Sequence, residues 1–80
     1  MIDKYQDIFD RGVFPYIHNR LHTEIDDYDL AREVYNRFPV YIAFFKCNQE
    51  MILEMLLQVI RGIRLVMTNN SNAQREANAN

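Results

Sequence analysis

Two histidines, His18 and His22, are four residues apart in a segment with helical periodicity. This spacing would place both imidazoles on one face of a helix, as in helical zinc sites, and Glu24 or Asp26 could add a carboxylate ligand. The residues between the histidines do not include the glutamate that acts as general base in an H-E-x-x-H site. We therefore interpret the pair as half-exposed polar residues beside an apolar stripe, and we predict no metal site.

A second group that could hold a cation is the acidic segment 24–29. It lacks the alternating aspartates, the glycine and the distal glutamate of a calcium loop. Asp26 or Asp27 is instead well suited to cap the helix that follows, because an aspartate carboxylate accepts hydrogen bonds from the free N–H groups of a first helical turn. An acidic patch for a basic partner is the functional alternative.

The single cysteine, Cys47, has Lys46 as its basic neighbour and no histidine nearby in the sequence. Reactive thiols need a strongly positive surrounding, so we interpret Cys47 as a small, half-buried residue inside a helix. The chain also shows no paired acid and base, no nucleophile beside a base and no phosphate-binding loop. We predict a protein that is not an enzyme, with no catalytic residue and no cofactor.

Apolar residues at helical spacing along the whole chain predict an all-α fold. Gly12 is placed to end a first helix, and Pro15 and Pro39 are placed to begin later ones, because a proline at a first helical position loses no hydrogen bond. The predicted elements are three short helices over residues 2–11, 15–23 and 27–38, packed on one long helix over residues 39–67.

The long helix carries a ladder of residues whose spacings alternate between three and four, as in helices that pack along their whole length. Other apolar residues flank the ladder and widen the apolar arc to about 200°, roughly twice what a one-sided surface helix needs. We therefore predict that homodimerisation completes a helical bundle. The predicted interface is the ladder itself: Ile42, Phe45, Gln49, Ile52, Leu56, Val59, Ile63 and Val66.

Size supports the same interpretation. Eighty residues make one domain at most. Residues 69–80 are rich in asparagine and poor in large apolar side chains, so we predict a helical domain over 1–68 and a disordered tail over 69–80. A core of this size often needs a disulfide, a metal or oligomerisation, and one cysteine cannot form an internal disulfide.

Charge and hydropathy narrow the function. A net charge of −2 gives no general attraction to nucleic acid or to an anionic membrane. No secretory signal and no transmembrane segment are evident, which predicts a soluble intracellular protein, cytoplasmic or nuclear.

The predicted function is protein–protein interaction by a small accessory or adaptor protein, and the composition suits a viral or phage source. The predicted partner is a second copy of the chain, with another protein beyond it. The alternative is a dimeric nucleic-acid-binding regulator that presents Arg20, Arg32 and Arg37. The negative net charge of the chain disfavours this alternative.

Overall fold

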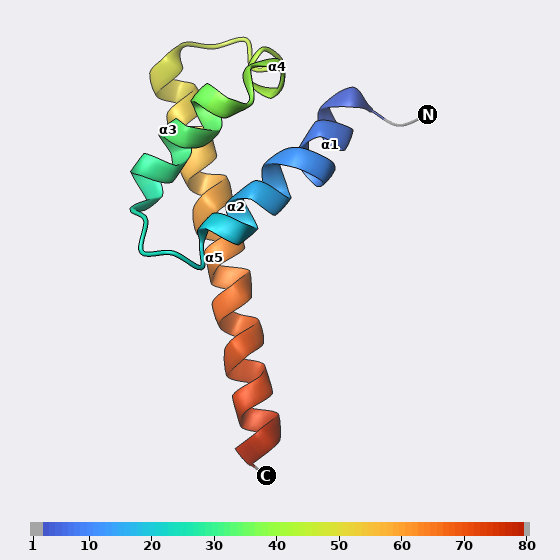
Figure 1. Ribbon diagram of the computed structural model, residues 1–80, viewed down its shortest axis with the longest axis vertical. Coiled ribbons are helices and arrows are strands. Elements are labelled where there is room, and N and C mark those ends of the chain that lie inside the picture. The colour runs from blue at the N-terminus through green and yellow to red at the C-terminus, as the bar shows by residue number, and fades with distance from the viewer. Residues whose placement is uncertain (1–2, 80) are drawn as a thin grey trace.

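The structure is a computed structural model that describes the backbone of residues 3–79 and the side chains of residues 3–69. Within this range every regular element is helical, which confirms the predicted all-α class (Figure 1). The elements are α1 (Lys4–Ile8), the π-helical turn η1 (Phe9–Val13), α2 (Phe14–Arg20), α3 (Asp27–Arg37), α4 (Pro39–Ile42) and α5 (Gln49–Ala79).

The first three elements form one continuous arm instead of two separate helices. Asp3 caps the arm, because its carboxylate accepts a hydrogen bond from the Tyr5 N–H at 3.1 Å. The prediction that Gly12 ends a helix is wrong, since no described glycine has a positive φ and the helix passes through it. Gly12 instead allows a close approach: a Cβ atom there would lie 3.1 Å from the ring of Phe38. The predicted first helical residue, Ile2, lies outside the described residues.

Pro15 lies inside this arm, where a regular α-helix would be disturbed. A proline in a helix interior has no N–H to donate, and its ring clashes with the carbonyl group four residues earlier. The π-helical turn η1 comes immediately before it, and there Phe14 donates to the carbonyl of Phe9, five residues back. The wider turn lets the arm continue past the proline. Pro15 therefore disturbs the helix locally, but it does not begin a separate helix as predicted.

Helix α3 agrees closely with the sequence. Asp26 is its N-cap and accepts a hydrogen bond from the Tyr28 N–H at 3.0 Å, which confirms the predicted capping role. The helix ends at Arg37, before Pro39, as the restricted backbone of a residue that precedes a proline requires. Its buried face consists of Leu30, Ala31 and Val34.

The predicted single helix over 39–67 is wrong at its start. Helix α4 begins at Pro39 as expected, but it ends after one turn at Ile42, and the chain reverses through residues 43–48. Asn48 then opens α5, because its side-chain oxygen accepts a hydrogen bond from the Met51 N–H at 2.9 Å. The reversal separates Ile42 and Phe45 from the rest of the ladder, and it places Cys47 in a loop instead of mid-helix.

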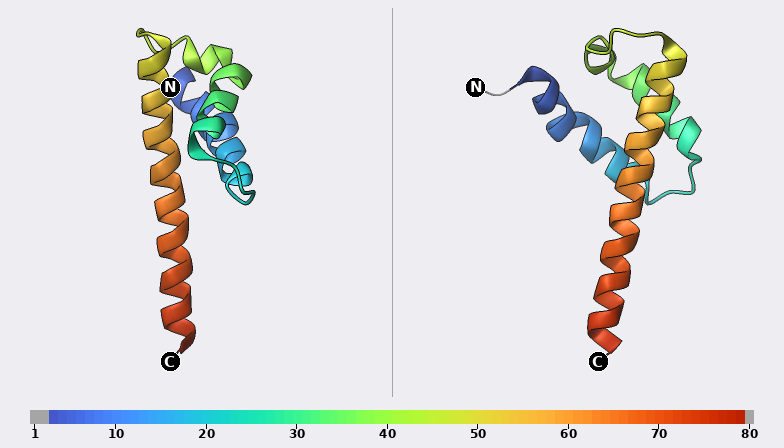
Figure 2. Two further views of the ribbon diagram at one scale, coloured as in Figure 1. Left: turned by 90° about the vertical axis from the view of Figure 1, so that its left-hand side faces the viewer. Right: turned by 180° about the vertical axis from the view of Figure 1, so that it is seen from behind.

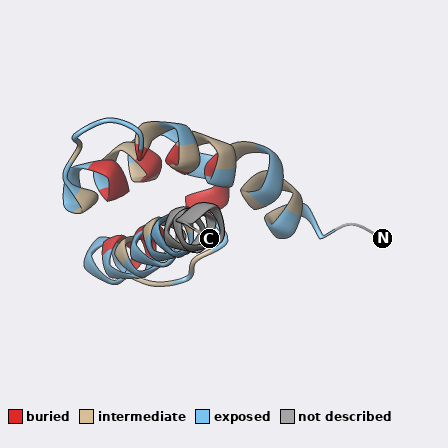
Figure 3. Ribbon diagram, turned by 90° about the horizontal axis from the view of Figure 1, so that it is seen from below, coloured by how far each residue is buried: buried red, intermediate tan, exposed pale blue. Residues whose placement is uncertain are grey.

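The helices form two layers. Helix α5 alone makes one layer, and the arm, α3 and α4 make the other, in a molecule only 17 Å thick along its shortest axis (Figure 2). Buried segments of both layers face each other across the molecule (Figure 3). The core between them consists of Val13, Ile17, Leu21, Leu30, Ala31, Val34, Tyr41, Ile42, Ile52, Leu53, Leu56 and Ile60.

An aromatic cluster fixes the arm to α4. The rings of Tyr5 and Tyr41 stack at 5.0 Å between centroids, and their hydroxyl groups share a hydrogen bond of 3.2 Å. Burial, helped by this hydrogen bond, raises the pKa of Tyr41 well above its ordinary value. Phe45 lies edge-on against both tyrosine rings.

The far end of α5 extends past every other element (Figure 1). Its backbone remains helical to Ala79, whereas the sequence predicts a disordered tail over 69–80. The side chains of 70–80 and the backbone of residue 80 lie outside the described residues. The division of the chain into a folded domain over residues 1–68 and a dispensable tail over residues 69–80 stays a prediction.

Candidate functional site

The most unusual surface of the molecule is an apolar stripe along α5. We define the α5 stripe as Met51, Met55, Val59, Gly62 and Val66, whose spacings of four, four, three and four keep them on one side of a helix. Met51, Met55 and Val66 are 52%, 44% and 58% exposed. Large apolar side chains at this exposure, in a continuous row, mark an interaction surface more often than chance scatter does.

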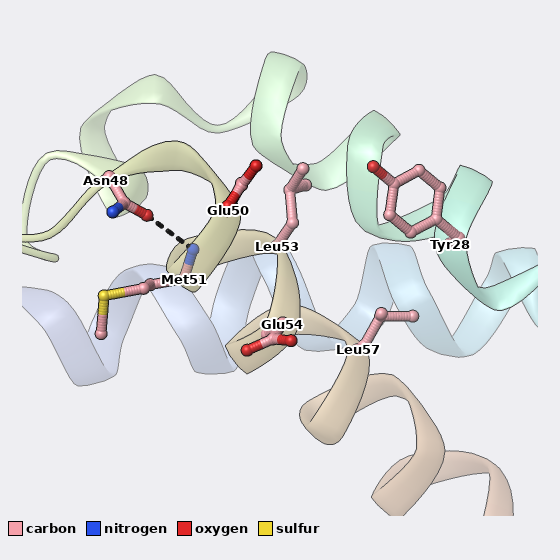
Figure 4. Close-up of a pocket in the computed structure, with 7 residues that line it drawn as sticks. All are labelled: Tyr28, Asn48, Glu50, Met51, Leu53, Glu54 and Leu57. Atoms are coloured by element: carbon pink, nitrogen blue, oxygen red, sulfur yellow. Dashed lines mark hydrogen bonds between the residues drawn. The ribbon is translucent and has the colours of Figure 1, made fainter.

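The stripe lies beside the buried face of α5 and not within it. Ile52, Leu56 and Ile60 point into the core. Met51, Met55 and Val66 are exposed on another side of the helix, and Val59 lies at the border, half-buried against the core. Figure 4 shows the start of this division, with Leu53 and Leu57 on the side of Tyr28 from α3 and Met51 turned to the other side of α5. The opposite layer therefore covers part of a wide apolar arc and leaves the rest of it open.

At its C-terminal end the stripe becomes one wall of a groove where α2 crosses α5. The groove has a volume of about 510 Å³. A Cβ atom added at Gly62 would have no neighbour within 4 Å, so this glycine contributes open space to the groove. The lining residues are Phe14, His18, Gln58, Val59, Gly62, Ile63, Val66 and Met67.

Aromatic packing within the arm holds the α2 side of the groove. The ring of Phe14 lies 6.1 Å from that of Phe9 and stacks at 6.1 Å on that of His18. His18 in turn meets His22 edge-on at 5.3 Å. Phe14 nevertheless remains 40% exposed. An apolar ring held between neighbours but still open to solvent is preorganised to contact another apolar surface.

A second hollow, of about 350 Å³, lies at the seam of α3 and α5, where Tyr28, Asn48, Glu50 and Glu54 bring polar groups to its wall (Figure 4). At this hollow the Met51 N–H donates a hydrogen bond to the Asn48 side-chain oxygen, which caps α5. Asn48 therefore has a structural role at the start of the helix. The groove beside Gly62 has no comparable structural role and is the better candidate site.

Charged residues border the stripe without entering it. Glu54 and Arg61 are exposed and seven residues apart, so they lie on the same flank of α5, close to the stripe. Other arginines form ion pairs within the chain, among them Arg11 with Asp7 at 2.9 Å. Arg64 binds Asp27 at 2.7 Å, and Arg20 binds Glu33 at 3.2 Å.

The predicted interface ladder is divided by the fold. Ile42, Ile52 and Leu56 are buried in the chain's own core, and Phe45 packs in the aromatic cluster. Gln49, the polar residue of the ladder, is the exposed first residue of α5.

Three other ladder residues, Val59, Ile63 and Val66, do come together, at the groove. Their role in a dimer stays a prediction. What the ladder missed are Met51, Met55 and Gly62, which the sequence shows only as flanking positions. Their signal was the run of spacings of four, four, three and four that joins them to Val59 and Val66.

The two histidines are in contact, with ring centroids 5.3 Å apart, but among residues 3–69 no third ligand side chain joins them. His18 lines the groove while His22 borders a different hollow beside Arg64, and among residues 3–69 no three histidine, cysteine, aspartate or glutamate side chains group as a metal site would require. In the acidic segment, Asp26 caps α3 and Asp27 pairs with Arg64. Cys47 is a half-buried free thiol.

Comparison of the chain with known protein families, with characterised proteins and with solved structures finds no match. The described helices include none that is both long enough and apolar enough to cross a membrane.

Proposed function

We propose that this protein is a non-enzymatic protein–protein interaction module that forms a homodimer through the α5 stripe and the adjoining groove. The observation that carries the proposal is the open row of Met51, Met55 and Val66 next to a groove with an apolar lining. Removing such side chains from water stabilises a complex by about 25 cal/mol for each Å² of apolar surface buried. The apolar face of a second helix has the shape that suits such a row.

The size of the chain supports self-association. The core is only two layers thick, and one of these layers is the single helix α5. Domains of this size have little stability to spare, and a second copy packed on the stripe would bury a further apolar face. Methionines favour such a surface because their flexible side chains adapt to the opposing one.

The alternative function is nucleic-acid binding, and some of the arginines expected to contact nucleic acid are already engaged within the chain. Arg20 donates to Glu33 through Nε and Nη2, so its charge is already balanced within the chain. Arg37 lies over the ring of Tyr16 at 5.0 Å, and Arg32 is exposed on a helix that also carries Asp29 and Glu33. A mobility shift on nonspecific DNA that weakens steeply with salt would favour this alternative over the proposal.

Sedimentation equilibrium over nanomolar to micromolar concentrations tests the proposal directly. We expect a dimer at micromolar concentration, with a reversible transition to monomer on dilution. A folded and soluble monomer at all these concentrations, with helical circular dichroism, would contradict the proposal.

A further inference from the structure

We infer that the two copies of α5 run antiparallel in the dimer, with Met55 of each copy seated against Gly62 of the other. The inference rests on the proposed function, and it adds the direction, the register and the occupant of the groove. It is derived from two properties of the stripe, the sizes of its side chains and the charges on its flank.

Size complementarity sets the register. The N-terminal half of the stripe has two large, flexible residues, Met51 and Met55, and its C-terminal half has one residue without a side chain, Gly62. Of the two methionines, Met55 is the one that, set against Gly62, leaves Met51 opposite Val66. Gly62 lies in the groove wall, where an added Cβ atom would meet nothing within 4 Å. In an antiparallel pair that places Met55 opposite the partner's Gly62, the twofold axis passes between Gln58 and Val59.

The same register matches the remaining stripe residues. Met51 then faces Val66 of the partner, so the whole stripe from Met51 to Val66, about 22 Å of helix, is paired with itself. On the groove side, Phe14 and His18 of α2 would flank the incoming helix. A twofold interface needs one surface that is complementary to itself, and this stripe has that property.

Charge complementarity sets the direction. Two antiparallel helices related by a twofold axis bring the same flank of each helix together. Glu54 and Arg61 share one flank of the stripe, and in this register Glu54 lies within about 3 Å, along the axis, of the partner's Arg61. The symmetry repeats the pair, so two opposite-charge pairs border the interface and support its direction.

A parallel arrangement satisfies neither the size match at Gly62 nor the charge match between Glu54 and Arg61. A parallel twofold pair brings opposite flanks together, so Glu54 and Arg61 would face the side of the partner where α2 lies and would not meet each other. In register, it would also set Met55 against the partner's Met55 and leave both Gly62 positions unfilled. The opening at Gly62 would then have no occupant.

Disulfide trapping tests the register. In chains that carry Cys47→Ser, we would mix equal amounts of Met55→Cys and Gly62→Cys and oxidise them gently. Facing positions on paired helices come within disulfide range, whereas each variant alone separates its two thiols by about 10 Å along the axis. We expect the mixture to form a bridged heterodimer and each variant alone to remain largely unbridged. Met55→Cys mixed with Thr68→Cys is the control for random collision.

The outcomes are separable. Rapid bridging of Met55→Cys with itself would overturn the antiparallel direction, and a dimer in which the mixture bridges no faster than the control would overturn the register. Both results leave the proposed function intact, whereas a monomer by sedimentation overturns the proposed function as well. Circular dichroism of each variant confirms the fold, which both exposed positions should tolerate.

A charge exchange tests the direction independently. Glu54→Arg and Arg61→Glu should each raise the dimer dissociation constant several-fold at low salt, because each places like charges across the interface. The double variant should return it close to that of the original chain. Failure of the double variant to recover affinity would contradict the pairing of Glu54 with the partner's Arg61.

Discussion

Two faces of α5 carry similar apolar side chains and have different surroundings. The inner face of Ile52, Leu53, Leu56 and Ile60 is at most 5% exposed, because the arm and α3 pack against it. The α5 stripe, next to it on the same helix, has Met55 at 44% and Val66 at 58%. The width of an apolar arc thus indicates how much surface must be covered. Which portion the chain covers itself depends on where the second layer lies.

The largest effect should come from a charge on the inner face. Leu56 is fully buried, so Leu56→Asp places a carboxylate in the core without a partner, and we expect destabilisation of about 4 kcal/mol or more. Loss of cooperative thermal unfolding by circular dichroism would show it. Leu56→Ala should be milder, at about 2–5 kcal/mol. A Leu56→Asp protein with an unchanged melt would show that Leu56 is not in the monomer core.

The same charge on the stripe should separate association from folding. Met55→Asp leaves the core intact, so helical circular dichroism should persist while the dimer weakens at least tenfold, which corresponds to about 1.4 kcal/mol or more. Sedimentation equilibrium measures the association. Asn36→Asp, an equal charge change on an exposed position of α3, is the matched control. Equal affinity in the two variants would remove the stripe from the interface.

A smaller effect is expected from shortening the end of α5. A chain that ends at Thr68 keeps every core residue and the whole stripe, so we expect its melting temperature to stay within a few degrees of the original. A thermal melt by circular dichroism measures this. A loss of ten degrees or more would show that residues 69–80 contribute to packing and would contradict the predicted domain division.

For metal removal we expect no effect on the stability of the protein. His18 and His22 supply half of a tetrahedral ligand set, so we expect no structural zinc and no change in the melt when a chelator is added. Elemental analysis of the purified protein gives the stoichiometry. Stoichiometric zinc, with a melt lowered by the chelator, would show that metal binding stabilises the α2 edge of the groove.

The sequence allowed the all-α class, α3 with its cap at Asp26, and the start of a helix at Pro39 to be predicted, because each depends on local backbone chemistry. It did not reveal the reversal at 43–48, where neither glycine nor proline interrupts the chain. The alternation of three and four also passes through Ile42, Phe45 and Gln49 by coincidence. The overlooked signal was Asn48, a good N-cap three residues before Met51.

The candidate site was predicted only in part for a different reason. Val59, Ile63 and Val66 were expected at an interface and do line the groove, but the groove also needs Phe14 from α2. The crossing of α2 over α5 depends on the continuous arm, and the arm depends on how the π-helical turn admits Pro15. No spacing within the long helix could reveal a surface that two distant segments share.

The π-helical turn η1 also gives the arm two orientations. A turn that closes over five residues instead of four inserts one residue, which rotates everything before it by about 100° around the helix axis. Before this turn, Tyr5 stacks on Tyr41 of α4, and after it, the helix α2 that carries the buried Ile17 contacts α3 and α5. The arm thus contacts neighbours in two different directions. The insertion or loss of one residue between Phe9 and Val13 is the smallest change that would alter which neighbours the arm contacts.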